Sequence, residues 1–162
     1  MIPFRTGFGY DVHQFAENRK LIIGGVEILF HKGLLGHSDA DVLLHAITDA
    51  MLGALALGDL GKHFPDTDNR YKNADSKIFL SETYKMIVEQ GYKIGNIDAT
   101  VVLEKPKLAP HIAKMRNVIA GLLTCSEEQI SVKATTSEKM GFVGNEEGVK
   151  AYANILLMKS EI

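Results

Sequence analysis

The central stretch of the chain reads Gly36-His-Ser-Asp-Ala-Asp-Val-Leu-Leu-His-Ala-Ile-Thr-Asp-Ala-Met-Leu-Gly-Ala-Leu-Ala-Leu57. It is rich in Ala, Leu and Met, which predicts a helix over residues 39–57. We expect Ser38 to cap the N-terminus of this helix, with Asp39 and Asp41 in its first turn, where the helix dipole favours carboxylates. A helix this apolar belongs in the core of the protein.

One polar stripe interrupts the apolar surface of this helix. Asp41, His45 and Asp49 are spaced four residues apart, which places them on one face. A solvated helix face would explain the two aspartates equally well. The flanking residues are apolar, however, and buried carboxylate and imidazole groups need partners, which a metal ion with an outer hydrogen-bond acceptor would supply. We therefore expect Asp49 to accept a hydrogen bond from a ligand imidazole.

Two further polar residues, Asp11 and His13, lie near the N-terminus, in Gly7-Phe-Gly-Tyr-Asp-Val-His-Gln-Phe15. Alternate side chains of a strand share a face, so Asp11 and His13 would project to one side, about 7 Å apart. Such pairs also arise by chance. Together with His45, however, they provide three ligands from two separate elements. Three ligands and an open position are typical of a catalytic metal site, whereas a structural zinc site takes four.

Hydrophobic periodicity outlines the rest of a single domain over residues 1–162. Strands are expected at residues 4–15, 20–29, 97–104 and 130–135, and helices at residues 76–90 and 110–123. Asp75 would cap the first of these helices and Gly91 would end it. Residues 149–158 form a further strand, although residues 151–158 also fit a helix. Strands interleaved with three helices predict an α/β or α+β fold.

Composition and charge narrow the classes of partner. The chain has 162 residues, 46% of them hydrophobic, enough for one proper core. Its net charge is −2 with no Lys/Arg block, which argues against nucleic acid as a main partner but not against a small anion. The absence of long apolar stretches and the early glycine motif predict a cytoplasmic protein without a membrane partner. Cys125 is the only cysteine, so an intramolecular disulfide is excluded.

Five segments of the chain, in order, resemble the 2-C-methyl-D-erythritol 2,4-cyclodiphosphate synthase family. These segments are residues 7–15, 33–45, 59–68, 106–111 and 133–142. Because they span nearly the whole chain, the resemblance is far more specific than any single short motif. It implies a compact mixed sheet covered by about three helices, assembled as a homotrimer with active sites between subunits.

The resemblance also implies a lyase reaction with two metal ions. The substrate would be 4-diphosphocytidyl-2-C-methyl-D-erythritol 2-phosphate, cyclised to 2-C-methyl-D-erythritol 2,4-cyclodiphosphate with release of CMP in non-mevalonate isoprenoid biosynthesis. One Zn²⁺ is implied at Asp11, His13 and His45. Glu138 would hold Mg²⁺ or Mn²⁺, which bridges the substrate diphosphate.

The implied substrate-binding residues fall into three groups. The first surrounds the metal ligands and a Gly/Asp/Pro-rich loop, which by itself fits a plain connection as well as a flap. Its members are Asp11, His13, His37, Ser38, Asp59, Leu60, Gly61, Phe64, Pro65, Asp66, Thr67 and Asp68. The second group, which would receive the cytosine base through main-chain atoms, is Leu103, Glu104, Lys105, Pro106, Lys107, Leu108 and Ala109. The third, near the phosphates, is Ala134, Thr135, Thr136, Ser137, Glu138, Phe142 and Asn145.

Two of these residues are implied to be catalytic. His37 and Thr136 would each bind a phosphate and stabilise the transition state. The position of His37 and Ser38, next to the free backbone donors of a helix start, is suited to a phosphate oxygen. Consecutive threonines at the end of a strand would also be explained by β-propensity alone.

Two other functions remain open from the residues alone. A metal-dependent phosphohydrolase would use the same three ligands to generate hydroxide and would release a linear product. A non-catalytic metal- or nucleotide-binding module would bind zinc and CMP without turnover. One departure from the family concerns Asn145, because members often carry an arginine there. That arginine is associated with anion or isoprenoid binding in the central cavity of the trimer, so such binding is in doubt here.

Overall fold

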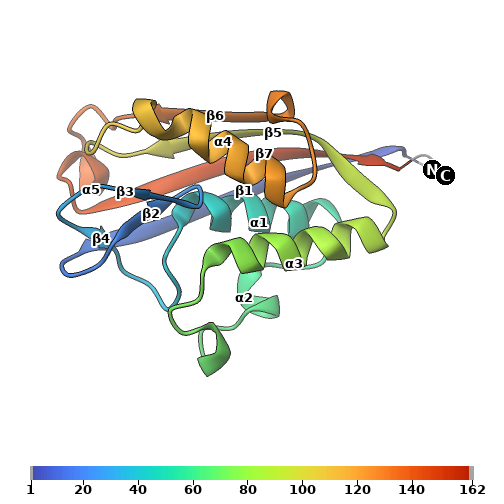
Figure 1. The fold of residues 1–162 in the computed structure, drawn as a ribbon, viewed down its shortest axis with the longest axis horizontal. Helices are drawn as coiled ribbons and strands as arrows, with labels where there is room; N and C mark the ends of the chain where they lie inside the picture. Colours follow the sequence, from blue (N-terminus) through green and yellow to red (C-terminus); the bar gives the residue numbers. More distant parts are fainter. Residues whose placement is uncertain (1, 161–162) are drawn as a thin grey trace.

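A five-stranded sheet forms the centre of the structure, a computed structural model that describes residues 2–160 (Figure 1). Its strands, in spatial order, are β4 (Gly33–Leu34), β1 (Phe4–Ala16), β7 (Gly148–Lys159), β5 (Tyr92–Val102) and β6 (Ile130–Thr135). β5 and β6 are parallel and the other pairs are antiparallel, so the predicted mixed sheet is confirmed. The ambiguous segment at residues 149–158 is a strand, since both β1 and β5 pair with it.

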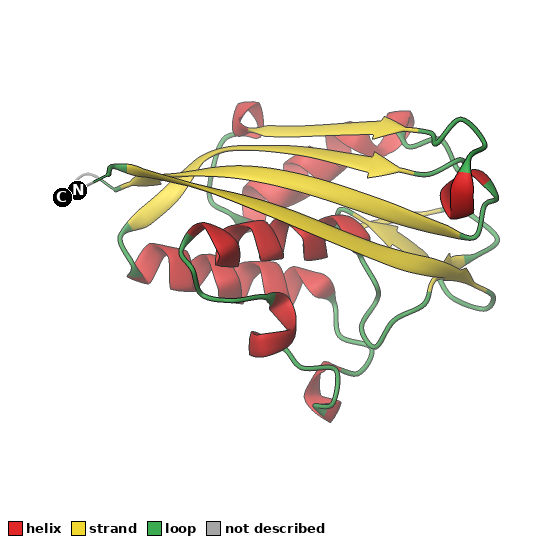
Figure 2. Cartoon of the chain, turned by 180° about the vertical axis from the view of Figure 1, so that it is seen from behind, coloured by secondary structure: helices red, strands yellow, loops and turns green. Residues whose placement is uncertain are grey.

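Three longer helices cover one face of this sheet. They are α1 (Val42–Ala54), α3 (Ser76–Glu89) and α4 (Ile112–Leu122), and Figure 2 shows them behind the strands. Shorter elements in the connections are α2 (Leu60–His63), α5 (Gly141–Gly144), and the 3-10 turns η1 (Asn69–Tyr71), η2 (Ala109–His111) and η3 (Glu127–Gln129). The predicted α/β class is confirmed. Within residues 2–160, no helix has the length and apolar character needed to cross a membrane.

Helix α1 lies unusually close to β1 because the strand carries two glycines under it. A Cβ atom would lie 1.9 Å from a backbone carbonyl oxygen of α1 if added at Gly7, and 1.8 Å if added at Gly9. Side chains of a strand alternate, so Asp11 and His13 project to the same face as these glycines. The close packing therefore brings the helix that carries His45 against the strand that carries the other two predicted ligands.

The opposite face of the sheet exposes a stripe of aromatic and aliphatic side chains. Phe8, Tyr10 and Val12 of β1 are 60%, 43% and 41% exposed. Tyr152 of β7 lies beside the first two, with ring centroids 6.2 and 5.3 Å away. We call these four residues the aromatic stripe. Exposed apolar patches of this kind mark interaction surfaces more often than plain solvent-facing surface.

The expected strand at residues 20–29 is in fact a hairpin. Its strands are β2 (Leu21–Ile23) and β3 (Val26–Ile28). Gly24 and Gly25 reverse the chain between them with φ angles of 63° and 72°, which non-glycine residues rarely adopt. The prediction of one continuous strand was wrong because the glycine pair carries the turn.

The expected start of α1 was also wrong. The N-cap is Asp41, not Ser38, so Asp39 precedes the helix. The buried carboxylate of Asp41 accepts hydrogen bonds from the backbone N–H groups of Gly24, Gly25 and Leu44, at 2.9, 2.7 and 3.0 Å. Burial raises the pKa of this carboxyl to about 6, despite those hydrogen bonds. Asp41 thereby joins the hairpin turn to the start of α1, a role that leaves it no part in a metal-facing stripe.

Candidate active site

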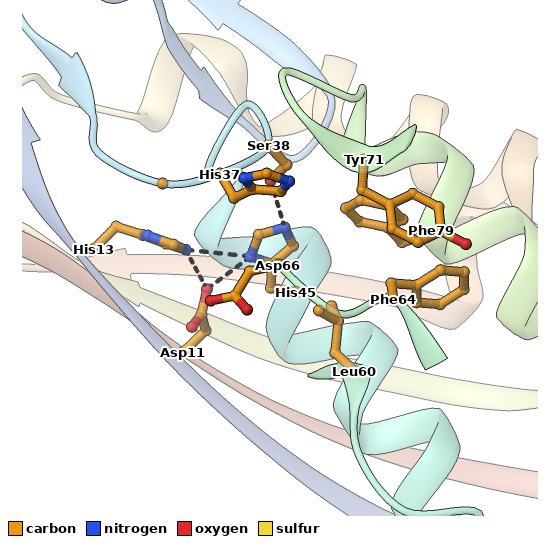
Figure 3. Close-up of a pocket in the computed structure, with 11 residues that line it drawn as sticks. Asp11, His13, His37, Ser38, His45, Leu60, Phe64, Asp66, Tyr71 and Phe79 are labelled. Carbon is orange, nitrogen blue, oxygen red and sulfur yellow. Dashed lines mark hydrogen bonds and ion pairs between the residues drawn. The ribbon is translucent and has the colours of Figure 1, made fainter. Parts of the chain in front are cut away.

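Asp11, His13 and His45 meet beside the first turn of α1, as the sequence predicts (Figure 3). Asp11 Oδ2 lies 2.8 Å from His13 Nε2 and 3.0 Å from His45 Nδ1, and the two ring nitrogens are 3.2 Å apart. The three side chains therefore converge on one position. Two imidazoles and a carboxylate are the ligand types of a catalytic zinc site with an open coordination position. These residues fit a zinc ion, and we call them the metal triad.

Hydrogen bonds on the far side of each ring determine which nitrogen is free. His13 Nδ1 lies 2.8 Å from the backbone oxygen of Leu35, which can only accept, so Nδ1 carries the proton. His45 Nε2 lies 2.8 Å from Ser76 Oγ. Ser76 donates its own hydroxyl proton to Asp39, so it accepts from His45. In a neutral ring, the nitrogen that faces Asp11 is therefore unprotonated, as metal ligation requires. A second proton on that nitrogen would instead be donated to the Asp11 carboxylate.

The electrostatics of the metal triad keep Asp11 ionised. Burial opposes the charge on this carboxylate, but hydrogen bonds and charge attraction from His13 and His45 together outweigh burial and lower its pKa to about 2. Burial likewise opposes a charge on His13, whereas its hydrogen bond to Asp11 raises the pKa of the ring, and the net shift is upward. A negative ligand is thus present at neutral pH, and metal binding competes with a proton on His13.

Asp49 is not the outer partner of a ligand imidazole. Its carboxylate accepts a hydrogen bond from the backbone N–H of Leu60, at 2.7 Å, and so holds the start of α2. The outer nitrogen of His45 faces Ser76 at 2.8 Å and Ser38 at 3.3 Å instead. The prediction from helical spacing was wrong because the partners of the ring come from other segments of the chain, one of them the start of α3.

A cavity of about 290 Å³ opens beside the metal triad. His37 and Ser38 line it from the segment before α1, and Leu60, Phe64 and Asp66 line it from the predicted loop. The other loop residues of the prediction, namely Asp59, Gly61, Pro65, Thr67 and Asp68, do not line this cavity. Two of them have local roles, since Asp59 caps α2 and Asp68 binds Arg70 at 2.6 Å.

The sequence did not identify two aromatic residues of this cavity. Tyr71 and Phe79 line it, with ring centroids 5.5 Å apart, and Phe64 lies 4.9 Å from Phe79. Figure 3 shows these three rings across the cavity from Asp11. Aromatic side chains give little functional signal in a sequence because most of them pack in cores. The three rings form an apolar wall on this side of the cavity.

A second pocket, of about 160 Å³, lies where β5 and β6 end. Its lining residues are Leu103, Glu104, Pro106, Lys107, Leu108, Ala109, Ala134, Thr135 and Thr136. All of them belong to the second and third predicted groups, so the structure brings these two distant segments together. Parallel pairing of β5 with β6 accounts for this, because it places the ends of both strands at the same edge of the sheet.

Glu104 organises the loop that follows β6. Its Oε1 accepts hydrogen bonds from the backbone N–H groups of Ser137 and Lys139, at 2.9 and 3.2 Å. Between these two residues, Glu138 has a φ of 52°, and its Oε1 lies 3.3 Å from Thr136 Oγ1. Glu104 thus fixes the turn that presents the predicted catalytic hydroxyl and the predicted second metal ligand. The Glu104 carboxylate therefore hydrogen-bonds to the backbone of this loop.

The two pockets share no lining residue. Phe142 belongs to neither of them but borders a third hollow, together with His13. Asn145 is exposed at the end of α5 and lines neither pocket. One chain therefore carries two separate pockets, with the metal triad in one and Thr136 in the other.

The fold and these two pockets define an enzyme of the α/β class with an open metal site. Residues 4–158 match the model of the YgbB family. A 2-C-methyl-D-erythritol 2,4-cyclodiphosphate synthase from Bacillus cytotoxicus is 59% identical over 156 residues, which cover 96% of this chain and 99% of that protein. The chain therefore belongs to the YgbB family, the family of the 2-C-methyl-D-erythritol 2,4-cyclodiphosphate synthases.

Solved structures support this assignment. IspF from Plasmodium falciparum, in a CDP complex, superposes with a TM-score of 0.86 at 37% identity, over 98% of this chain and 97% of that one. The bifunctional IspDF from Campylobacter jejuni superposes with a TM-score of 0.94 at 45% identity. There the match covers 98% of this chain but 43% of the longer relative.

Proposed function

We propose that this chain cyclises 4-diphosphocytidyl-2-C-methyl-D-erythritol 2-phosphate to 2-C-methyl-D-erythritol 2,4-cyclodiphosphate. An oxygen of the 2-phosphate attacks the β-phosphorus of the diphosphate, the bond from that phosphorus to the CMP oxygen breaks, and CMP leaves. This is a phosphorus–oxygen lyase reaction of non-mevalonate isoprenoid synthesis. The observation that carries the proposal is an open metal triad in a chain that matches synthases of this name over nearly its full length.

The side chains of the metal-triad cavity would act by positioning and by charge stabilisation. No protein nucleophile is needed, because the substrate carries both reacting groups. His37, whose Nε2 donates to the backbone oxygen of Asp68 at 3.1 Å, would bind a phosphate from the edge of the cavity. Thr136, in the second pocket, would likewise bind a phosphate and stabilise the transition state. The aromatic wall would keep water from the attacked phosphorus.

Two metal ions complete the proposed chemistry. Zn²⁺ bound by Asp11, His13 and His45 would withdraw charge from phosphoryl oxygens. Glu138, an exposed carboxylate beside Thr136, would hold Mg²⁺ or Mn²⁺ against the substrate diphosphate.

The pocket at the ends of β5 and β6 would take the cytidine part of the substrate. Relatives solved with CDP support a cytidine nucleotide as the ligand class. Most of the residues that the segment from Leu103 to Ala109 contributes to this pocket are aliphatic or proline, so main-chain hydrogen bonds would recognise the base edge. We also propose that the reaction takes place in the cytoplasm, since the substrate is a highly charged nucleotide derivative.

A homotrimer would bring the metal-triad cavity of one subunit together with the second pocket of its neighbour. We call these two pockets the half-sites of one active site. The metal triad and Thr136 lie in pockets that share no residue, so the facing half of each site would come from a neighbouring copy. The aromatic stripe gives the chain an apolar surface for this association. Burial of such a face is typical of permanent oligomers.

The test is incubation of the protein with the cytidyl substrate, zinc and magnesium, with mass spectrometry of the products. We expect CMP and the cyclic diphosphate in equal amounts, and neither after chelation of the metals. A linear phosphate product would identify a phosphohydrolase instead. Binding of zinc and CMP without turnover at saturating substrate would identify a binding module.

A further inference from the structure

We propose that Ser76 and Asp39 form a positioning relay that orients His45 and strengthens its binding of the metal ion. The inference rests on the proposed role of His45 as a ligand. It adds two residues that neither the motifs nor the helical spacing identified. We call the three residues the His45 relay.

The contacts of the His45 relay run from the ring of His45 through Ser76 to the half-buried carboxylate of Asp39. Ser76, the first residue of α3, is completely buried, and its Oγ lies 2.8 Å from His45 Nε2. The carboxylate of Asp39 accepts the hydroxyl proton of Ser76 through Oδ1 and its backbone N–H through Oδ2, the latter at 3.1 Å. Asp39 thus holds Ser76 at two points, which fixes the direction of the hydroxyl.

This direction determines the protonation of the ring. A serine hydroxyl has a single proton, and here a carboxylate takes it, so only a lone pair remains for the imidazole. The shorter contact of His45 Nε2 therefore requires a proton on that nitrogen, while Ser38 Oγ lies farther away, at 3.3 Å. In the neutral ring, Nδ1 is then the free donor atom that faces Asp11 at 3.0 Å. The carboxylate also makes the serine oxygen a better acceptor, which increases electron density on the metal-binding nitrogen. The relay therefore sets both the tautomer and the basicity of the ligand.

The backbone around the His45 relay is held in place as well. The N–H of Asp39 donates to the oxygen of Ala74 at 3.0 Å, and the N–H of Asn73 donates to the oxygen of His37 at 2.7 Å. These bonds join the segment before α1 to the segment before α3. The ring of His45 is consequently positioned before a metal ion arrives, and less ordering is needed on binding.

The test measures zinc affinity by titrating the zinc-loaded protein with a competing chelator, without substrate. We expect Ser76→Ala and Asp39→Asn each to lower the affinity by about 10- to 100-fold, the usual effect of losing an outer partner of a metal ligand. The double variant should lose little more than either single variant, because the two residues act through one contact. Ser76→Thr, which keeps the hydroxyl, should bind zinc more tightly than Ser76→Ala.

Asp75→Ala is the matched control. Asp75 caps the same end of α3 by accepting from Lys77 N at 2.9 Å, but it does not contact His45. Its loss weakens the start of the helix and should leave zinc affinity unchanged. Equal losses in Asp75→Ala and Ser76→Ala would overturn the relay, since loosening of α3 would then explain both.

A spectroscopic readout separates the relay from general damage to the fold. In the cobalt-substituted protein, the visible absorption of the ion should shift in Ser76→Ala and Asp39→Asn but not in Asp75→Ala. If Ser76→Ala keeps the parental affinity and spectrum while His45→Ala loses zinc, the relay is refuted and the metal site stands. If His45→Ala itself keeps its zinc, the proposed ligand role fails.

Discussion

The metal-triad cavity and the pocket at the ends of β5 and β6 are built in contrasting ways. The first is lined by ionisable and aromatic side chains, including Asp11, His13, His37 and Asp66. The second is lined mostly by aliphatic residues, a proline and small side chains, and we propose that its segment 103–109 binds a base through main-chain atoms. Chemistry at a phosphate requires particular side-chain atoms, whereas a base edge can be bound by any residue's main chain. Substitutions should therefore be far more damaging in the first region than in the second.

The largest effect is expected for the metal triad itself. His45→Ala or His13→Ala should remove bound zinc and essentially all activity, because each takes away one of three ligands. The fold should remain, since the core is built by other residues. Metal analysis after dialysis, together with circular dichroism, measures both results. Stoichiometric zinc in either variant would contradict the ligand assignment.

The carboxylate next to Thr136 should rank second. Glu138→Gln keeps the size of the side chain but removes the charge that would hold the magnesium-type ion, so kcat should fall by about 100-fold, as for the loss of one stabilising group in a transition state. Zinc content should match the parent, because Glu138 does not line the metal-triad cavity. Kinetics across a range of magnesium concentrations tests this, and an unchanged magnesium dependence would argue against its role.

A substitution of Glu104 would test whether activity depends on the conformation of the loop that carries Thr136 and Glu138. Glu104→Ala removes the acceptor for two backbone N–H groups of the turn at residues 137–139. A displaced turn should lower kcat by about 10-fold, since small errors of position cost activity. Glu104→Gln, which keeps one acceptor oxygen, is the matched control and should retain more activity. If both variants behave like the parent, the loop does not depend on this side chain.

The smallest effect is expected for Lys107 in the second pocket. Lys107 lines it, and its side chain is exposed. If the base is bound through the main chain, Lys107→Ala should change KM by no more than about threefold, within the range of ordinary surface substitutions. Steady-state kinetics gives the answer. A large rise in KM would show that side chains contribute to nucleotide binding and would weaken the contrast between the two regions.

Elements that depend on local patterns were predictable from the sequence, whereas elements that depend on contacts between distant segments were not. The strand at residues 130–135 and the helix capped by Asp75 were predicted correctly, because alternation and capping are local patterns. The start of α1 was wrong because Asp41 binds a glycine turn 16–17 residues earlier in the chain. Periodicity along one helix cannot show a partner on another segment. The structure shows that the partner of Asp41 is the turn at Gly24 and Gly25.

The same limit applies to the site. The convergence of Asp11, His13 and His45 was predicted from their own chemistry, because few residue types bind zinc. The contact between Ser76 and His45 was not predicted, since a serine at the start of a helix is ordinary in a sequence. The residues of the second pocket were found only through the resemblance to a family, because backbone recognition leaves no distinctive side chains to detect.

The separation of the two half-sites has a consequence for mixtures of damaged subunits. In the proposed trimer, each complete site would combine the metal triad of one subunit with Glu138 of its neighbour. A subunit with a faulty triad and a subunit with a faulty loop would then restore one another wherever they meet in the right order. Random assembly of His45→Ala with Glu138→Gln in equal amounts would leave about a quarter of the sites with two intact halves in a cyclic trimer. Two strongly impaired preparations would thus regain activity on reassembly, and two such alleles of one gene would complement each other.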